Sequence, residues 1–484
     1  MTDATLKNYI NGEWVDAATD DLRTIINPAT GAYLTTVPMS TCPDVNRAVK
    51  AARAAFPAWR KTPVVVRARY LFSLKQCMER DYDELARTIV CEEGKTIDDA
   101  RGEVRRGIES VEVACGIPSL MQGSTLEDVA TGIDTDLVRQ PIGVFCVIPP
   151  FNFPLMVPLW FIPFAVACGN TVVVKPSEQV PMSQAYLFRL IDEVKFPPGV
   201  LNLVHGSREV VDALIEHPEV NGVSFVGSAP VAREIYARAA AHGKRAQCLG
   251  GAKNFIVVMP DAELDKTVEG ILSSAFGAAG ERCLAGSVVV AVGGIHERLE
   301  PLLATAAAAM NVGNGLNANV DMGPVVSQRH RERVASFIQK GIDEGARLLL
   351  DGRTSDLATQ EEGAFLGPTL FTDVDPTMAI GREEIFGPVL SVMHATTLDD
   401  ALELVNSSRF GNAAVIFTQS GKAARQFKYD VQCGMVGVNV GVPAPMAMFP
   451  FTGWKDSFFG DLHGNGRDSI EFYTEKKVVI ERWF

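Results

Sequence analysis

The chain has 484 residues, 47% of them hydrophobic and 21% charged, so it can bury large cores and is too long for a single ordinary domain. Its 45 basic and 58 acidic residues give a formal net charge of −13, which argues against nucleic acid or an anionic membrane surface as a partner. The nine cysteines lack close pairs, which fits neither a disulfide framework nor a metal-ligand pattern and indicates a reducing, cytoplasmic setting.

The beginning of the chain shows no targeting signal. Met1 to Lys7 has no basic segment followed by an apolar one, so the chain is expected to start as mature protein. Turn signals at 11–14 and 27–31 flank short β-like runs and predict small antiparallel strands. Apolar residues then recur at helical spacing from Asp44 to Trp59 and from Arg67 to Val90, and residues 103–107 lie in a third predicted amphipathic helix.

A long uncharged stretch runs from Gly143 to Val174 and has the length of a membrane span. Its prolines at 149, 150, 154, 158 and 163 would break a single spanning helix. The stretch therefore predicts a buried strand, a loop and a helix, with no membrane as partner.

Two alternations of short apolar runs and helix-length segments follow, and both predict an α/β fold. The runs at 144–148, 171–174, 200–204, 222–226 and 254–258 are β-branched and uncharged, which is typical of a doubly wound, parallel dinucleotide-binding sheet. The second set, at 287–292, 389–394, 413–417 and 436–440 with helices at 295–309, 398–407 and 420–430, predicts a catalytic domain.

Two further segments lie outside both alternations. Residues 126–140 are polar and strand-like, and the terminal residues 476–484 form an apolar strand. An exposed apolar edge strand favours aggregation unless something covers it.

The stretch from Phe276 to Ala285 is the candidate catalytic segment because its glycines and alanines leave backbone amides bare beside Cys283. Arg282 adds positive charge that would favour the thiolate, so Cys283 is the predicted nucleophile. The alternative is a buried, inert cysteine. A Gly-x-Gly-x-x-Ala match at 313–318 is interpreted as a decoy, because residues 319–324 cannot open an apolar helix.

Six motifs occur in one order along nearly the whole chain. They are Pro-Phe-Asn-Phe-Pro at 150–154, Lys-Pro-Ser-Glu at 175–178, Phe-Val-Gly-Ser at 225–228, Leu-Gly-Gly at 249–251, Gly-Glu-Arg-Cys at 280–283 and Glu-Glu-Ile-Phe-Gly-Pro at 383–388. Together they resemble the NAD(P)-dependent aldehyde dehydrogenase superfamily. Residues 251–254 and 458–464 resemble its CoA-acylating methylmalonate-semialdehyde dehydrogenases, although Leu284 and Phe255 replace a methionine and a histidine common there.

The resemblance implies a domain organisation. Residues 1–123 and 143–250 would form the NAD-binding domain, and 251–469 the catalytic domain. Residues 124–142 and 470–484 would build an oligomerisation sheet between subunits. We therefore expect a homo-oligomer, a dimer or a dimer of dimers, with the tetramer favoured.

The cofactor residues are expected after two strands of the first sheet. Lys175 and Glu178 resemble the pair that holds the adenosine ribose, with Gln179 at its border, and the carboxylate of Glu178 favours NAD over NADP. Gly227 and Ser228 would offer bare amides and a hydroxyl to a pyrophosphate at a helix N-terminus, or Ser228 is an ordinary cap. The resemblance adds Pro149, Phe151, Gly250, Glu384 and Phe386 around the nicotinamide end.

Asn152 resembles the donor that stabilises the oxyanion formed when the Cys283 thiolate attacks an aldehyde, or it caps a turn among prolines. Hydride transfer would leave a thioester on Cys283. Cys248 stands where hydrolytic members carry the glutamate that activates water, which favours transfer of the acyl group to coenzyme A. Cys248 itself is interpreted as a packing residue, and Asp468 as a conceivable proton relay.

Arg106 and Arg282 match positions that hold the substrate carboxylate in the resembling subfamily, and guanidinium groups bind carboxylates with bidentate geometry. The expected reaction oxidises malonate semialdehyde or its 2-methyl form, and coenzyme A collects acetyl or propionyl after loss of carbon dioxide. Two alternatives remain: a hydrolytic dehydrogenase of another acidic aldehyde, and a noncatalytic binding or structural protein.

Overall fold

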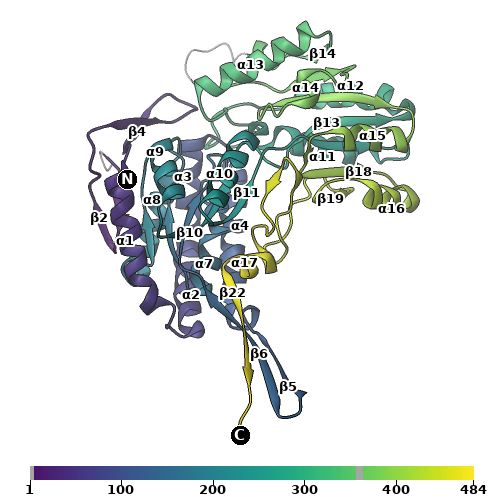
Figure 1. Ribbon diagram of the computed structural model, residues 1–484. Helices are drawn as coiled ribbons and strands as arrows, with labels where there is room; N and C mark the ends of the chain where they lie inside the picture. The colour runs from purple at the N-terminus through teal and green to yellow at the C-terminus, as the bar shows by residue number, and fades with distance from the viewer. Residues whose placement is uncertain (1–4, 356–362) are drawn as a thin grey trace.

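Two large sheets divide the chain in the computed structural model, which describes residues 5–355 and 363–484 (Figure 1). The eight-stranded sheet has the order β2 (Glu13–Val15), β1 (Asn8–Ile10), β9 (Leu201–Leu203), β8 (Thr171–Val174), β7 (Val144–Ile148), β10 (Val220–Val226), β11 (Arg245–Leu249) and β21 (Phe458–Phe459). Its strands from β9 to β11 are parallel, whereas β1 pairs antiparallel with β2 and β9, and β21 pairs antiparallel with β11.

The central strand β7 shows why this sheet is covered on both faces. Phe145 and Val147 pack into one apolar cluster with helices α2 (Val64–Arg80), α4 (Ile97–Cys115), α7 (Ile162–Cys168) and α8 (Met182–Val194). Cys146 and Ile148 pack on the opposite face with α1 (Cys42–Trp59), α9 (Arg208–Glu216) and α10 (Ala229–Ala241). Alternate side chains of an uncharged strand thus enter two cores, which confirms the predicted doubly wound sheet.

The helical pattern at 67–90 was predicted as one continuous helical stretch, and this is wrong. The helix breaks at Asp81 into α2 and α3 (Tyr82–Glu93), where the backbone of Asp81 has φ −98° and ψ 21°. The Asp81 carboxylate accepts hydrogen bonds from Arg80 Nε at 2.7 Å and from the Tyr186 hydroxyl at 3.1 Å. A residue whose side chain finds partners outside helical geometry favours a helix end.

The seven-stranded sheet has the order β14 (Arg347–Leu350), β15 (Thr369–Thr372), β16 (Val389–Ala395), β13 (Gly286–Val292), β12 (Asn254–Val258), β18 (Ala413–Phe417) and β19 (Met435–Val438). Grouping the run at 254–258 with the first sheet was wrong, because β12 lies between β13 and β18. The unpredicted strand β11 takes the next place in the first sheet instead. Helices α11 (Leu264–Phe276), α12 (His296–Ala308), α13 (Gln328–Asp343), α15 (Leu398–Ser407) and α16 (Gly421–Asp430) belong to this second part.

A three-stranded antiparallel sheet of β5 (Ser124–Ala130), β6 (Ile133–Pro141) and β22 (Thr474–Glu481) projects below the body as an arm that ends at the C-terminus (Figure 1). β6 lies in the middle, so within the described residues neither β5 nor β22 pairs with a further strand at its outer edge. The two segments that stood outside both alternations are therefore partners in one sheet.

The smaller elements complete the chain. They are β3 (Leu22–Ile26), β4 (Tyr33–Pro38), α5 (Ile117–Leu120), α6 (Met156–Leu159), α14 (Ala379–Arg382), β17 (Phe410–Gly411), β20 (Trp454–Lys455), α17 (Gly466–Phe472) and the 3₁₀ turns Gly277–Gly280, Gly293–Ile295 and Gly352–Thr354. The uncharged stretch 143–174 forms β7, a loop, α6, α7 and β8, as predicted. Among the described residues, no helix has the length and apolar character needed to cross a membrane.

Candidate active site

Cys283 lies on a loop between α11 and β13 whose backbone is unusually constrained. Ala278, Ala279 and Gly280 have φ values of 49°, 52° and 72°, in the left-handed region. A Cβ atom at Gly280 would come within 2.3 Å of the Gly387 carbonyl oxygen, so this position accepts only glycine. Nδ2 of Asn254 and Nδ2 of Asn412 each donate to the Cys283 carbonyl at 2.8 Å, which fixes the loop beside the thiol.

Two cavities meet at Cys283. The first, here named the α4 pocket, has a volume of about 380 Å³. It lies against α4 and is lined among others by Asp99, Arg106, Glu109, Phe153, Trp160, Arg282 and Phe451. Cys283 lines both this pocket and the second cavity.

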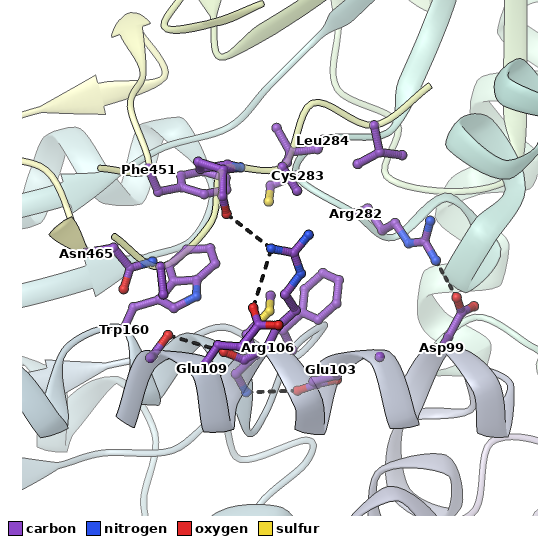
Figure 2. Close-up of a pocket in the computed structure, with 18 of the residues that line it drawn as sticks. Asp99, Glu103, Arg106, Glu109, Trp160, Arg282, Cys283, Leu284, Phe451 and Asn465 are labelled. Carbon is purple, nitrogen blue, oxygen red and sulfur yellow. Dashed lines mark hydrogen bonds and ion pairs between the residues drawn. The ribbon is translucent and has the colours of Figure 1, made fainter. Parts of the chain in front are cut away.

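Both predicted substrate arginines line the α4 pocket, but they differ in orientation. Figure 2 shows Arg106 reaching from α4 toward Cys283, whereas Arg282 turns away toward Asp99. Nη1 of Arg106 lies 3.4 Å from the Pro445 carbonyl oxygen and 3.7 Å from Glu109 Oε2. Arg282 donates to the Asp99 carboxylate, and its charge is thereby already paired.

The surroundings of Cys283 raise the pKa of its thiol in the free protein. Burial, and after it the negative charge of Glu384, raise its pKa to about 12, and the opposing effect of Arg282 is smaller. Arg282 does favour the thiolate, as the sequence predicts, but burial of the sulfur outweighs its effect.

Asn152 reaches the cysteine loop from the segment after β7. Its side chain is buried, and its Nδ2 donates to the Glu281 carbonyl at 2.7 Å. Glu281 is the second residue before Cys283, so the amide bridges to the segment that carries the thiol instead of capping a turn in its own loop. An amide nitrogen has two donors, and this contact uses one of them.

The second cavity, named the sheet-edge cavity, has a volume of about 670 Å³ and opens after the carboxyl ends of β7, β8 and β10. Every residue predicted to bind the cofactor lines it. These are Pro149, Phe151, Lys175, Glu178, Gln179, Gly227, Ser228, Gly250, Glu384 and Phe386. The carboxyl ends of parallel strands are where ligands bind in doubly wound sheets.

Lys175 and Glu178 form an ion pair at the wall of this cavity, with Nζ 2.9 Å from Oε2. Arg23 from β3 lies 3.6 Å from the other carboxylate oxygen. Burial alone would raise the pKa of Glu178, but the two cations, Lys175 first, lower it. Sequence reasoning missed Arg23, since nothing in the N-terminal hairpin signals that it folds against this loop.

The region around Gly227 and Ser228 leaves the start of α10 open. Ser228 is the N-cap residue, yet its side chain makes no capping hydrogen bond, so its hydroxyl does not act as an ordinary cap. A Cβ atom at Gly227 would lie 2.5 Å from the Phe225 ring, and one at Gly250 would lie 2.6 Å from the Asp456 carbonyl oxygen. Both positions therefore need glycine for close packing.

Glu384 and Phe386 close the other end of the cavity. The Ala252 amide donates to Glu384 Oε1 at 2.9 Å, and burial raises the pKa of this carboxyl to about 7. Phe386 has φ 61° and packs edge-to-face on Phe151, with ring centroids 5.7 Å apart. Two residues that sequence reasoning missed hold this loop: His330 contacts the Phe386 carbonyl at 2.6 Å, and Arg333 donates to the Ile385 carbonyl at 2.7 Å.

Comparison with known proteins decides the family. Residues 14–479 match the model of the aldehyde dehydrogenase family. The chain belongs to the aldehyde dehydrogenase family. It is 54% identical over 479 residues to malonate-semialdehyde dehydrogenase 3 of Geobacillus kaustophilus, covering 99% of both chains.

Two solved structures of this family are also similar. One is methylmalonate-semialdehyde dehydrogenase from Oceanimonas doudoroffii, with 45% identity, a TM-score of 0.97 and coverage of 99% of this chain and 98% of that one. The other, from Sinorhizobium meliloti 1021, is assigned as a methylmalonate-semialdehyde dehydrogenase and is complexed with NAD, with 44% identity, a TM-score of 0.97 and the same coverage. The family and subfamily resemblance inferred from the motifs is confirmed.

Cys248 is fully buried in the core between the first sheet and α1, α9 and α10, and it lines neither cavity at Cys283. Its pKa is raised by burial, which agrees with a packing role. Asp468 pairs with His463, 3.2 Å from its Nδ1, and lines neither of these cavities. No metal-binding group of His, Cys, Asp or Glu occurs within the described ranges.

Proposed function

We propose that this aldehyde dehydrogenase oxidises malonate semialdehyde or methylmalonate semialdehyde with NAD, through a thioester on Cys283, and passes the acyl group to coenzyme A. The observation that carries the proposal is the position of Cys283 between the two cavities. The α4 pocket contains Arg106, whose guanidinium faces the thiol. The sheet-edge cavity is lined by all the predicted cofactor residues. An aldehyde bound at Arg106 would thus present its carbonyl carbon to the sulfur and its hydrogen toward the sheet-edge cavity.

The sheet-edge cavity fits NAD. Lys175 and Glu178 would hold the adenosine ribose, with Gln179 beside them, and the amides at Gly227 and Ser228 would face the pyrophosphate at the start of α10. Glu384 would accept hydrogen bonds from the nicotinamide ribose, while Pro149, Phe151, Gly250 and Phe386 enclose the ring. When bound, the oxidised nicotinamide supplies a positive charge and accepts the hydride.

Acylation depends on the Cys283 sulfur and the Asn152 amide. The thiol loses its proton to solvent, the sulfur forms a bond to the aldehyde carbon, and the electron pair of the C=O π bond moves to the carbonyl oxygen. The free N–H of Asn152 and the Cys283 backbone amide would stabilise that oxyanion, by about 3–4 kcal/mol for one well-placed donor. Loss of hydride from the tetrahedral carbon leaves the thioester on Cys283.

Substrate choice rests on the α4 pocket. We assign Arg106 as the arginine that binds the substrate carboxylate, because its guanidinium faces Cys283 and its nearest carboxylate oxygen, on Glu109, is 3.7 Å away. Arg282 lines the same pocket and joins the carboxylate site only if it exchanges Asp99 for the substrate. Both arginines remain part of the proposed substrate site.

The residue at position 248 favours coenzyme A over water as the acceptor of the acyl group. Cys248 supplies no carboxylate to activate water, whereas a thiol needs less help than water to attack a thioester. The β-carboxylate of the malonyl-type thioester leaves as carbon dioxide, its bonding electrons pass to the α-carbon, and that carbon takes a proton. The coenzyme A thiol then displaces Cys283 and yields acetyl-CoA or propionyl-CoA.

The decisive experiment measures NADH formation from malonate semialdehyde with and without coenzyme A, and identifies the acyl product by mass. Turnover that requires coenzyme A and yields acetyl-CoA supports the proposal. Equal turnover without coenzyme A, with free acid as product, would establish the hydrolytic alternative. Failure to bind NAD in a thermal-shift titration would instead favour the noncatalytic alternative.

The proposal includes a homotetramer built as a dimer of dimers. The arm leaves β5 and β22 with free edges, and it exposes apolar side chains such as Val478 and Ile480 at 60% and 69%. Such edges need covering, and a second copy of the chain offers the same strands. Light scattering of the purified protein tests this, and a monomeric mass at micromolar concentration would contradict it.

We also propose the division into an NAD-binding domain (1–123 and 143–250), a catalytic domain (251–469) and the arm segments (124–142 and 470–484). Cleavage near residue 250 in limited proteolysis would support it, and cleavage inside either sheet would not. A cytoplasmic location is proposed because all nine cysteines, which lie in the described residues, are unpaired. Cell fractionation tests this location.

A further inference from the structure

A fully buried lysine lies directly behind Asn152. Lys95, in the connection between α3 and α4, has no exposed side-chain area, and its Nζ donates to the Asn152 carbonyl at 2.6 Å. The same ammonium group donates to Glu103 Oε2 at 2.8 Å and lies 4.0 Å from the centroid of the Phe153 ring. Lys95 thus binds the backbone of the residue whose side chain is the proposed oxyanion donor.

Glu103 extends this contact along the same loop. Its Oε1 atom accepts hydrogen bonds from the Leu155 amide at 2.8 Å and the Met156 amide at 3.1 Å. Glu103 belongs to α4, the helix that also carries Arg106. The Lys95–Glu103 pair therefore fastens the loop 152–156 at three backbone groups to the helix that forms the substrate wall.

Stability alone explains this pair poorly. Burying an ammonium and a carboxylate costs several kcal/mol per ion, and an apolar pair of similar volume is often as stable or more so. A pair of buried charges does, however, hold a backbone segment in one position, because its hydrogen bonds are short and directional. The Asn152 amide uses one N–H on Glu281, so the direction of its second N–H depends on where the backbone is held.

We propose that Lys95, supported by Glu103, is a positioning residue for catalysis: it holds the Asn152 backbone so that the second side-chain N–H points to the oxyanion. The inference rests on the proposed function, since it requires Asn152 to be the oxyanion donor. Lys95 lines neither cavity at Cys283, so its effect on the reaction passes through Asn152.

The test is a double-mutant cycle between Lys95→Met and Asn152→Ala, read as the rate of the first NADH turnover with saturating substrate. Misplacing a catalytic group by about 1 Å can cost about 10²-fold, so Lys95→Met is expected to slow acylation by about that factor with unchanged NAD affinity. In the Asn152→Ala background the same substitution should have almost no effect, because the group that Lys95 positions is gone.

Removing only Lys95 leaves two buried carboxylates, Glu103 and Glu93, without the cation that they share, and the variant could fail to fold. Lys95→Met combined with Glu103→Gln removes this ion pair and keeps an acceptor for the Leu155 and Met156 amides. Because Glu103 also lines the α4 pocket, Glu103→Gln alone is measured beside it. Lys244→Met is the matched control: Lys244 is also buried and donates to the Val220 carbonyl at 2.8 Å, at the start of β10, whereas the sheet-edge cavity opens at the other end of that strand. The control should lose stability but keep the wild-type acylation rate.

The outcomes separate this inference from the proposed function. If Asn152→Ala itself leaves acylation unchanged, the oxyanion assignment is wrong. If Asn152→Ala slows acylation while the folded Lys95→Met and Glu103→Gln double variant does not, only the positioning role fails. Equal losses from Lys95→Met in both backgrounds would also overturn it, since independent effects add.

Discussion

Arg282 is bound to Asp99 across the α4 pocket, and the same carboxylate accepts the Ala278 amide at 3.0 Å. Asp99 on α4 therefore holds two residues of the loop that carries Cys283. This loop includes the left-handed Ala278 and Ala279, so the bonds compensate for backbone strain close to the nucleophile. In the free protein Arg282 therefore helps to hold the cysteine loop, whereas the guanidinium of Arg106 faces Cys283.

Arg106→Ala should weaken binding of the acidic substrate. A hydrogen bond to a charged group contributes about 1.5–3 kcal/mol, so KM for malonate semialdehyde should rise about 10- to 100-fold with a smaller change in kcat. Arg282→Ala should lower kcat more than it raises KM, because it releases the cysteine loop. Steady-state kinetics of both variants measure how much each substitution changes KM and how much it changes kcat.

Propionaldehyde, which lacks the carboxylate, is the control substrate for these variants. Arg106→Ala should leave its KM unchanged. If Arg106→Ala affects both aldehydes equally, the arginine does not bind the carboxylate and the substrate assignment is wrong.

The reactivity of Cys283 toward iodoacetamide should depend steeply on pH. Because burial raises its pKa to about 12, the thiolate fraction of the free enzyme should rise about tenfold per pH unit across the neutral and mildly alkaline range. NAD should increase the rate at constant pH, since positive charge near the sulfur favours the thiolate.

Mass spectrometry of the alkylated peptide measures this rate. The Cys283→Ala variant shows how much alkylation occurs at other cysteines, such as the exposed Cys42. A plateau near pH 8–9, as for an ordinary thiol of pKa about 8.5, would show that Cys283 is already activated in the free protein.

Glu178→Ser should relax the preference for NAD. Without the carboxylate, Lys175 and Arg23 would face the ribose with unpaired positive charge, which attracts a 2′-phosphate. KM for NADP should fall by about 10-fold or more, in line with one new charge-assisted hydrogen bond.

Adding Arg23→Ala to Glu178→Ser should remove part of this gain, because one of the two cations is lost. If NADP binds no better to Glu178→Ser than to the wild type, this loop does not hold the adenosine ribose.

Cys248→Ala should leave the chemistry unchanged. The side chain packs in the core and lines neither cavity at Cys283, so kcat, the requirement for coenzyme A and the acyl product should stay as in the wild type. The free energy of unfolding should fall by about 1 kcal/mol, as for a typical small core truncation. A loss of acyl transfer without loss of stability would show that the thiol takes part in deacylation.

The local pattern of the sequence was sufficient to predict most strands of both sheets. Uncharged β-branched runs mark buried parallel strands whatever surrounds them, which is why β7, β8, β13 and β18 lie where the sequence predicts them. The break at Asp81 was not visible in the same way, because it depends on a contact with Tyr186, which is remote in sequence.

Sequence alone identified most residues of the proposed site, since the motifs contain Cys283, Asn152 and all the proposed cofactor residues except Pro149 and Gln179. Only the tertiary structure decided how they are oriented and held. The pairing of Arg282 with Asp99, the approach of Arg23 to Glu178 and the support of Asn152 by Lys95 join segments that share no pattern. Such contacts depend on how whole helices and strands pack, and no local signal of charge or spacing specifies them.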